Sequence, residues 1–149
     1  MEEKYKPIRP EDVFITAFKR QPTEEELWHD ITLKSNGNRP SGNNFIDLFA
    51  HLIYTHGRKD IRDYARMMDV SADDLYRTIR VLGGMSAPKW RNRYLLLEAQ
   101  ELLTKSKMEI SAISKILGFS QPSVFSHFFH SLTGKQPFEW RNKRPRIKP

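Results

Sequence analysis

Two histidines and a serine, His127, His130 and Ser123, share one face of a helix that is predicted near the C-terminus of the chain. A pair of imidazoles three residues apart is one half of a zinc site, because neutral histidine nitrogens bind Zn²⁺ well. A complete site needs further ligands, and no carboxylate or thiolate stands in register with this pair. We therefore predict no metal here. We interpret these side chains as groups presented to a partner, with plain solvated surface as the alternative.

A second polar face lies earlier in the chain. Asp73, Arg77 and Arg80 point to one side of a predicted helix, and Tyr76 flanks them. Arginine carries its N–H donors in a planar fork, so such a face is suited to acceptor groups on a polyanion. An ordinary solvated helix face has the same composition, and the interpretation depends on the element that carries these residues.

The sequence offers no catalytic constellation. It contains no cysteine, no HExxH pair and no glycine-rich phosphate loop. We predict that the chain is not an enzyme and uses no cofactor. The missing cysteines fit a reducing compartment, and the sequence has neither an apolar signal-peptide core at its N-terminus nor an apolar run of ~18 residues. We expect a cytoplasmic protein without a membrane segment.

The positive charge is concentrated in the C-terminal two thirds of the chain. Formal net charge is +7 over 149 residues. Residues 1–42 hold 7 Lys and Arg against 8 Asp and Glu, whereas residues 43–149 hold 18 against 10. The stretch 141–149 alone carries five cations. This distribution favours a polyanionic partner for residues 43–149.

The chain divides at a turn-rich stretch, residues 35–43. Before it, three prolines within residues 1–22 predict an irregular arm, and Thr23 with Glu26 forms a capping box that begins a short helix. After it, apolar residues recur at helical spacing and alternating strand patterns are absent. The expected helices cover residues 44–57, 61–68, 71–82, 88–103, 110–117, 120–132 and 137–141. We predict an all-α architecture.

An internal repeat underlies these helices. A shift of 49 residues aligns the first helix of each copy, and a shift of 50 aligns the second, so the second turn has one extra residue. The aligned pairs are Ile61 with Ile110, Leu75 with Phe125, Ile79 with Phe129, Gly84 with Gly134, and Trp90-Arg91 with Trp140-Arg141.

Each copy predicts a helix-turn-helix, whose second helix can enter a DNA major groove. In the first copy the turn is residues 69–70 and Ser71 caps the second helix. In the second copy Gly118 supplies a left-handed turn residue, Phe119 fills the turn and Ser120 is the expected cap. The predicted core residues of the two second helices are Leu75, Ile79 and Leu82, and Phe125, Phe128, Phe129 and Leu132.

Three stretches resemble one family closely: IRDYARMMDVSADDLYRTIRVLGG, RYLLLEAQELL and EISAISKILGFSQPSVFSHFFHSLTGKQPFEWR. They are similar to the DNA-binding domain of AraC/XylS transcription regulators. The resemblance implies two homeodomain-like helix-turn-helix subdomains joined by a linker helix, with a short N-terminal extension. The expected domains are an arm at 1–42, the DNA-binding domain at 43–144 and a basic tail at 145–149. The two helix-turn-helix subdomains are expected at about 44–87 and 109–142, with the linker helix at about 88–103.

By resemblance, both second helices are recognition helices on double-stranded DNA. The implied base-reading residues are Asp73, Tyr76, Arg77, Gln121, Ser123, Val124 and His127. The expected phosphate contacts are Ser71, Arg80, Ser120, His130, Lys135, Arg141, Lys143 and Arg144.

The expected function is that of a sequence-specific transcription regulator, acting as a monomer or weak homodimer. No ligand-sensing domain is expected, so control would come from abundance or from RNA polymerase or another protein docking on residues 1–42. One alternative is an accessory factor for recombination or mobile-element excision. Another is a protein-interaction module, since residues 60–84 are net acidic and the histidines stand where the family more often has Arg and Lys.

Overall fold

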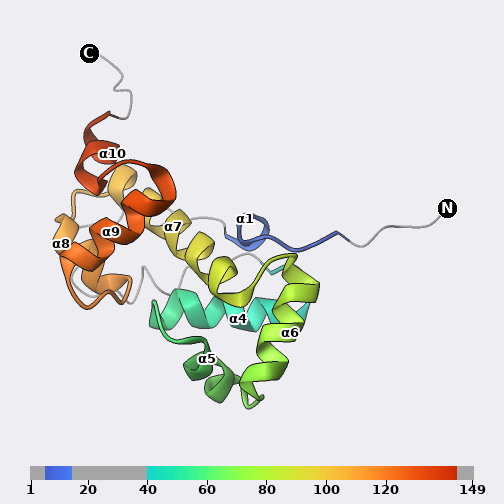
Figure 1. Cartoon of the computed structure of the whole chain (residues 1–149). Coiled ribbons are helices and arrows are strands. Elements are labelled where there is room, and N and C mark those ends of the chain that lie inside the picture. Colours follow the sequence, from blue (N-terminus) through green and yellow to red (C-terminus); the bar gives the residue numbers. More distant parts are fainter. Residues whose placement is uncertain (1–5, 15–39, 144–149) are drawn as a thin grey trace. The chain divides into compact units, whose positions relative to one another are not determined.

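The computed structural model describes residues 6–14 and 40–143, and these residues form helices and no strands (Figure 1). They belong to two compact units. The first holds residues 6–14 and 40–95, and the second holds residues 96–143. The helices are α1 (Pro10–Val13), α4 (Asn44–His56), α5 (Ile61–Met68), α6 (Ala72–Gly83), α7 (Ala87–Lys105), α8 (Ile110–Ile116), α9 (Pro122–Thr133) and α10 (Pro137–Lys143).

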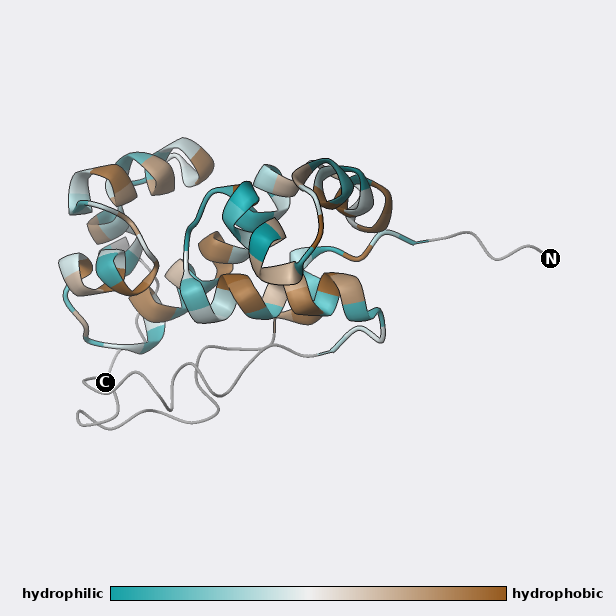
Figure 2. Ribbon diagram, turned by 90° about the horizontal axis from the view of Figure 1, so that it is seen from below, coloured by the Kyte–Doolittle hydropathy of each residue, from teal (hydrophilic) through white to brown (hydrophobic). Residues whose placement is uncertain are grey.

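The predicted helices from residue 44 onward are all present, and the all-α fold is confirmed for the described part of the chain. Their ends differ from the predicted ones by no more than two residues. The short helix expected after Thr23 lies outside the described residues. Apolar residues recur among polar ones along the helices, as amphipathic packing requires (Figure 2).

The first unit is built around a cluster of aromatic rings. Phe49 of α4 meets Tyr64 of α5 edge-on at 5.5 Å and lies against Trp90 of α7 at the same centroid distance. Tyr94 stacks on Trp90 one turn further along α7. All four side chains are fully buried. Rings of this size contribute most of the buried apolar area, so this cluster anchors α4, α5 and α7 to one another.

Residues 6–14 of the predicted irregular arm are part of this first unit, and Pro10–Val13 within them form α1. The Ile8 amide donates to the Leu82 carbonyl at 2.8 Å, and Trp90 Nε1 donates to the Ile8 carbonyl at 2.8 Å. Val13 is completely buried, and Glu11 forms an ion pair with Arg93 of α7. These contacts with α6 and α7 fold the segment, and no local sequence pattern predicts them.

The second unit has its own aromatic core. Phe119, in the turn between α8 and α9, packs against Phe125 at 5.2 Å and Phe128 at 4.9 Å. Phe129 meets Trp140 of α10 edge-on at 5.6 Å. Phe125 and Phe129 are fully buried, as predicted, and Phe128 is half-buried. The core position predicted for Leu132 is wrong, since this side chain near the end of α9 is 45% exposed.

The two turns confirm the repeat at the level of individual hydrogen bonds. Asp69 takes a left-handed φ of 60°, and Gly118, 49 residues later, has a φ of 89°. In both turns the next residue, Val70 or Phe119, donates its amide to a carbonyl five residues back. Aspartate tolerates this conformation better than most residues, whereas glycine adopts it without steric cost.

The extra residue of the second turn changes the helix cap. Ser71 caps α6 by accepting from the Asp74 amide at 3.0 Å. In the second unit the cap position falls on Gln121, and its side chain makes no capping hydrogen bond. Ser120 is displaced by one position, so its predicted capping role is wrong. Pro122 begins α9 in the first turn, where a missing amide costs little.

The repeated Trp-Arg pair also has a repeated structural role. Arg91 Nη1 donates to the Lys59 carbonyl at 2.8 Å, and Arg141 Nη1 donates to the Met108 carbonyl at 2.7 Å. Both acceptors lie two residues before the first helix of a helix-turn-helix, α5 or α8. Each arginine therefore ties the last helix of a unit to the entry of its helix-turn-helix.

Candidate nucleic-acid interface

The outward face of α6 is set by the burial of its opposite face. Leu75 and Ile79 are completely buried against the first unit. The predicted interface residues of this helix are all exposed in consequence, and Ser71 is exposed at its start. These residues are Asp73, Tyr76, Arg77 and Arg80.

The acidic residues of the first helix-turn-helix are largely neutralised by neighbouring arginines. Arg77 Nη2 lies 2.6 Å from Asp74 Oδ1, and Arg66 Nη2 lies 2.6 Å from Asp63 Oδ1. Arg62 also pairs with Asp60, and its hydrogen bond to that carboxylate lowers the pKa of Asp60. Arg80 makes no ion pair with any residue that the structure describes. Most of the negative charge of residues 60–84 is therefore paired with neighbouring arginines. Arg80 leaves a positive charge, unpaired among the described residues, at the C-terminal end of the recognition face.

The outward face of α9 is polar and lacks carboxylates. Phe125 and Phe129 anchor the helix, and the opposite side exposes the predicted residues Gln121, Ser123, Val124, His127 and His130. Among the residues that the structure describes, no group of three His, Cys, Asp or Glu side chains is close enough to hold a metal. The histidines are therefore surface groups with hydrogen-bonding capacity on both ring nitrogens.

The guanidinium of Arg141 is bound to the main chain of the second unit. Its guanidinium donates to the carbonyls of Leu103 at 2.9 Å and Met108 at 2.7 Å, with longer bonds to Leu102 and Ser106. Burial lowers the pKa of Arg141, because desolvation disfavours the charged form. Its donors are occupied by main-chain acceptors, so we do not retain it as a phosphate contact.

The remaining predicted backbone contacts lie at the ends of the second unit's helices. Ser120 is exposed before α9, and Lys135 is half-buried in the turn before α10. Lys143 is the last residue of α10. Arg144 lies outside the described residues.

Comparison with known proteins decides the family. A family model described as a helix-turn-helix domain matches residues 64–143, which is more than half of the chain and spans both units. The chain is 31% identical over 91 residues to the arabinose operon regulatory protein of Salmonella typhimurium, covering 61% of this chain and 32% of that protein. The chain belongs to the AraC/XylS family.

Solved AraC-type domains have the same fold. The C-terminal domain of AraT, a response regulator from Geobacillus stearothermophilus, superposes with a TM-score of 0.64 at 21% identity, covering 73% of this chain and 93% of that one. The DNA-binding domain of the transcriptional factor AdpA, solved with a target DNA, gives a TM-score of 0.61 at 22% identity, with coverages of 68% and 93%. The predicted AraC-type domain with two helix-turn-helix units is confirmed.

The AraC-type match leaves part of the chain unexplained. The chain spans between 28% and 39% of the length of the curated AraC-type relatives that it matches. The matched range begins inside α5, so residues 6–14 and α4 lie outside it. None of the described helices is both long and apolar enough to cross a membrane.

Proposed function

We propose that the chain binds double-stranded DNA at specific sequences and regulates transcription, with α6 and α9 as its two recognition helices. The observation that carries this proposal is the duplicated helix-turn-helix in which both second helices bury an apolar face and expose a polar one. A helix held in this way fits a major groove, where base pairs present distinct donor and acceptor patterns.

The base-reading set that we propose differs between the two helices. On α6 Arg77 is the main donor, suited to the acceptor edge of guanine, and Asp73 is suited to the amino group of cytosine. On α9 the proposed readers are Gln121, Ser123, Val124 and His127. Glutamine can make a bidentate contact to adenine, and the valine methyls suit the methyl group of thymine. In this proposal α6 therefore reads bases with charged side chains, and α9 reads them with uncharged ones.

The proposed backbone contacts surround these readers. Ser71, Arg80, Ser120, His130 and Lys135 are candidates for phosphate oxygens, together with Lys143 and Arg144 at the C-terminus. Such contacts supply affinity and register, and sequence preference comes from the base edges. The relatives support regulation as the purpose, since the Salmonella protein is named as an operon regulator and AdpA as a transcriptional factor.

Selection from a random duplex pool with the full chain tests the proposal. We expect an enriched sequence with two conserved segments about one helical turn apart, since the two recognition helices would contact successive major-groove segments. Binding measured by fluorescence anisotropy should weaken linearly on a plot of log K against log salt. A pool that shows no enrichment, or an affinity that does not respond to salt, would rule out this function.

A further inference from the structure

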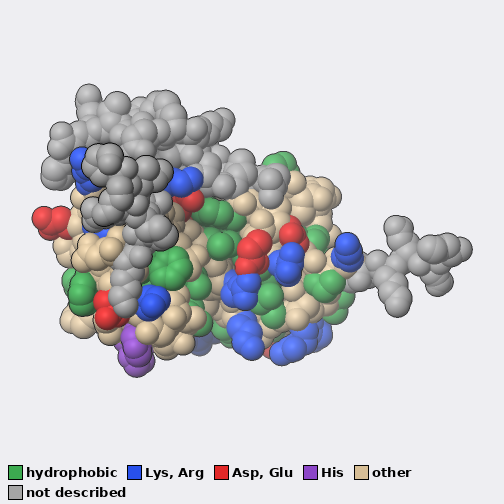
Figure 3. All heavy atoms as spheres, turned by 90° about the horizontal axis from the view of Figure 1, so that it is seen from above, with side chains coloured by type: hydrophobic (Ala, Val, Ile, Leu, Met, Phe, Trp, Pro, Cys, Tyr) green, Lys and Arg blue, Asp and Glu red, His purple; other side chains and the backbone are tan. Residues whose placement is uncertain are grey.

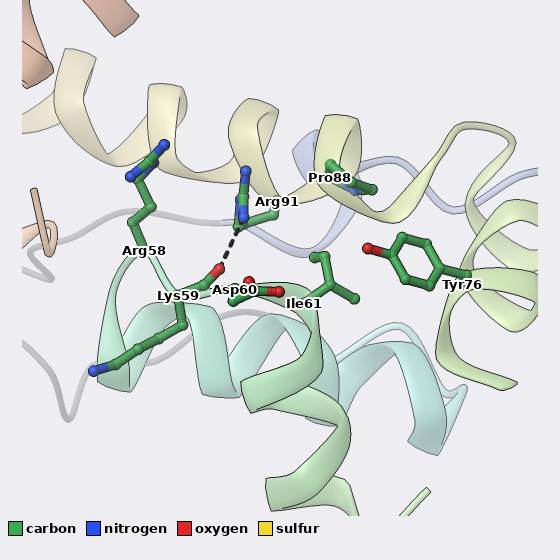
Figure 4. Close-up of a pocket in the computed structure, with 7 residues that line it drawn as sticks. All are labelled: Arg58, Lys59, Asp60, Ile61, Tyr76, Pro88 and Arg91. Atoms are coloured by element: carbon green, nitrogen blue, oxygen red, sulfur yellow. Dashed lines mark hydrogen bonds between the residues drawn. The ribbon is translucent and has the colours of Figure 1, made fainter. Parts of the chain in front are cut away.

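A hollow in the first unit gathers positive charge beside the recognition helix (Figure 4). It is lined by Arg58, Lys59, Asp60, Ile61, Tyr76, Pro88 and Arg91, which come from the segment before α5, from the first residue of α5, from α6 and from the start of α7. Three of these residues are basic, and one is acidic. Figure 3 shows Lys and Arg side chains gathered on one face of this unit with a few acidic side chains among them.

The single carboxylate of the hollow is already engaged. Asp60 caps α5 by accepting from the Arg62 amide at 3.1 Å, and it pairs with the Arg62 side chain. It therefore neutralises a cation outside the hollow. Burial lowers the pKa of Arg91, because desolvation disfavours its charged form; the charge of Arg58 lowers the pKa further, and that of Asp60 raises it. An anion in the hollow would stabilise the charged form of Arg91.

Arg91 keeps more donor capacity than its counterpart in the second unit. It makes one hydrogen bond to the Lys59 carbonyl and two to the amide oxygen of Asn92, and the charge of the nearby Asp60 carboxylate acts on it as well. Arg141 instead makes four hydrogen bonds to main-chain carbonyls. A guanidinium has five N–H donors, so Arg91 has two left for an incoming acceptor.

Tyr76 connects the hollow to the recognition face. It stands three residues after Asp73 and four before Arg80, so it lies beside both on α6. Figure 4 shows its hydroxyl pointing between Pro88 and Ile61, toward the side of the hollow that Arg91 occupies. In a helix-turn-helix the first helix crosses the DNA backbone while the second lies in the groove, and the hollow opens at the start of that first helix.

We infer that this hollow binds one backbone phosphate of the duplex that α6 recognises. Arg58 and Arg91 supply the charge, and the Tyr76 hydroxyl donates to a phosphate oxygen. This inference rests on the proposed function and moves Tyr76 from the base-reading residues implied by the family resemblance to the backbone contacts. Arg58, Lys59 and Arg91 are absent from the residues that the sequence indicates for DNA contact, because only folding brings them beside Tyr76.

Replacing single phosphates of the DNA backbone with uncharged groups tests the inference directly. A duplex selected by the wild-type chain is prepared with single methylphosphonates, each of which removes the charge of one phosphate. We expect one position beside the first half-site to weaken binding of the wild-type chain and to weaken binding of Arg58→Gln less, because only Arg91 and Tyr76 remain to contact that phosphate. Arg58 is exposed, so we expect this variant to fold, and urea denaturation checks it against the wild-type chain. Lys107→Gln changes the repeat-equivalent cation of the second unit and should keep the full penalty at that position.

Two further measurements complete the test. Arg58→Gln should make the slope of log K against log salt shallower by about 0.9, the value for one phosphate. Tyr76→Phe should weaken binding roughly 3- to 10-fold without changing that slope, because it removes a hydrogen bond and no charge. If Arg58→Gln keeps the wild-type slope and the wild-type penalty at every methylphosphonate, the phosphate site does not exist.

The controls separate this inference from its foundation. A wild-type chain that binds no duplex overturns the proposed function itself, whereas normal wild-type binding with unaltered Arg58→Gln behaviour overturns only the phosphate site. Inorganic phosphate is also titrated without DNA, at constant ionic strength, while the Arg91 Nε–H signal is followed by NMR. Saturation at micromolar phosphate would assign the hollow to the free ion and overturn its assignment to the duplex.

Discussion

Arg77 and Asp74 are joined across one turn of α6, with the guanidinium Nη2 2.6 Å from the carboxylate Oδ1. Both side chains are exposed, so the pair adds little to stability, in the range of about 0–1 kcal/mol. Its effect is geometric, since it holds the main proposed base-reading donor in one orientation. The same aspartate donates its amide to Ser71 at the helix cap. Asp74 therefore links the cap of α6, through its amide, to Arg77, through its carboxylate.

Replacing Arg77 should change sequence preference more than it changes the fold. We expect Arg77→Ala to cost about 1–3 kcal/mol of binding free energy on a selected duplex and to relax the preference at one position of the first half-site. Repeating the selection with the variant measures both effects. Arg66→Ala is the matched control, since Arg66 is 73% exposed against 71% for Arg77 and pairs with an aspartate at the same spacing and distance. Equal preference profiles for Arg77→Ala and wild type would contradict the assignment of Arg77.

The two serines before the recognition helices should behave differently. Ser71→Ala removes the cap of α6 and should lower the free energy of unfolding by about 1 kcal/mol. Ser120→Ala should leave it nearly unchanged, because the Ser120 hydroxyl does not cap α9. Urea denaturation followed by circular dichroism compares the two variants. Equal losses of stability would show that Ser120 has a structural role that its geometry does not predict.

The left-handed turn residues offer a reciprocal exchange. Asp69→Gly should stabilise the chain by roughly 0.5–1 kcal/mol, since glycine relieves the steric cost of a φ of 60° and part of this gain is lost to unfolded-state entropy. Gly118→Ala should destabilise by about 1–2 kcal/mol for the opposite reason. Thermal denaturation of both variants tests the pair. A destabilised Asp69→Gly would mean that the aspartate side chain makes a compensating contact.

Variants of Arg141 and Arg80 should distinguish a loss of stability from a loss of DNA binding. Arg141→Met strands main-chain carbonyls at the start of the second helix-turn-helix, and we expect a loss of about 2–3 kcal/mol in unfolding free energy. Arg80→Gln should keep stability and reduce both affinity and the salt slope, since it removes one exposed cation from the recognition face. Chemical denaturation and anisotropy titrations are run on both proteins. A fully stable Arg141→Met would remove the structural role assigned to this arginine.

The predictable part of the fold is the part that depends on local patterns. Helical periodicity and the repeat located every helix after residue 44, and the buried faces of α6 and α9 determined which side chains face outward. The helix boundaries followed from residues such as Gly57, whose φ of 77° ends α4. Such signals are contained within a few residues, so a single sequence carries them.

The unpredicted features depend on contacts between distant residues. The folding of residues 6–14 depends on α7, since Ile8 bonds to Trp90 and Glu11 bonds to Arg93, each 82 residues further along the chain. The direction of Arg141 depends on four carbonyls that only the folded second unit brings together. One clue was present in the sequence, because the repeat pairs Arg141 with Arg91 and each follows directly after a tryptophan. Two arginines placed identically in a duplicated core are better candidates for structural roles than for surface ones.

The segment around Ile8 also determines the order in which the chain can fold. Its hydrogen bond to Trp90 closes a loop of 82 residues. The hydrogen bond of Arg141 that reaches furthest along the sequence closes a loop of 39 residues. Long closures cost more chain entropy and slow folding. The core around Trp90 can be completed only after α7 has left the ribosome. Until then the N-terminal segment must remain available, and any fusion or truncation before α1 acts on the last step of folding in the first unit.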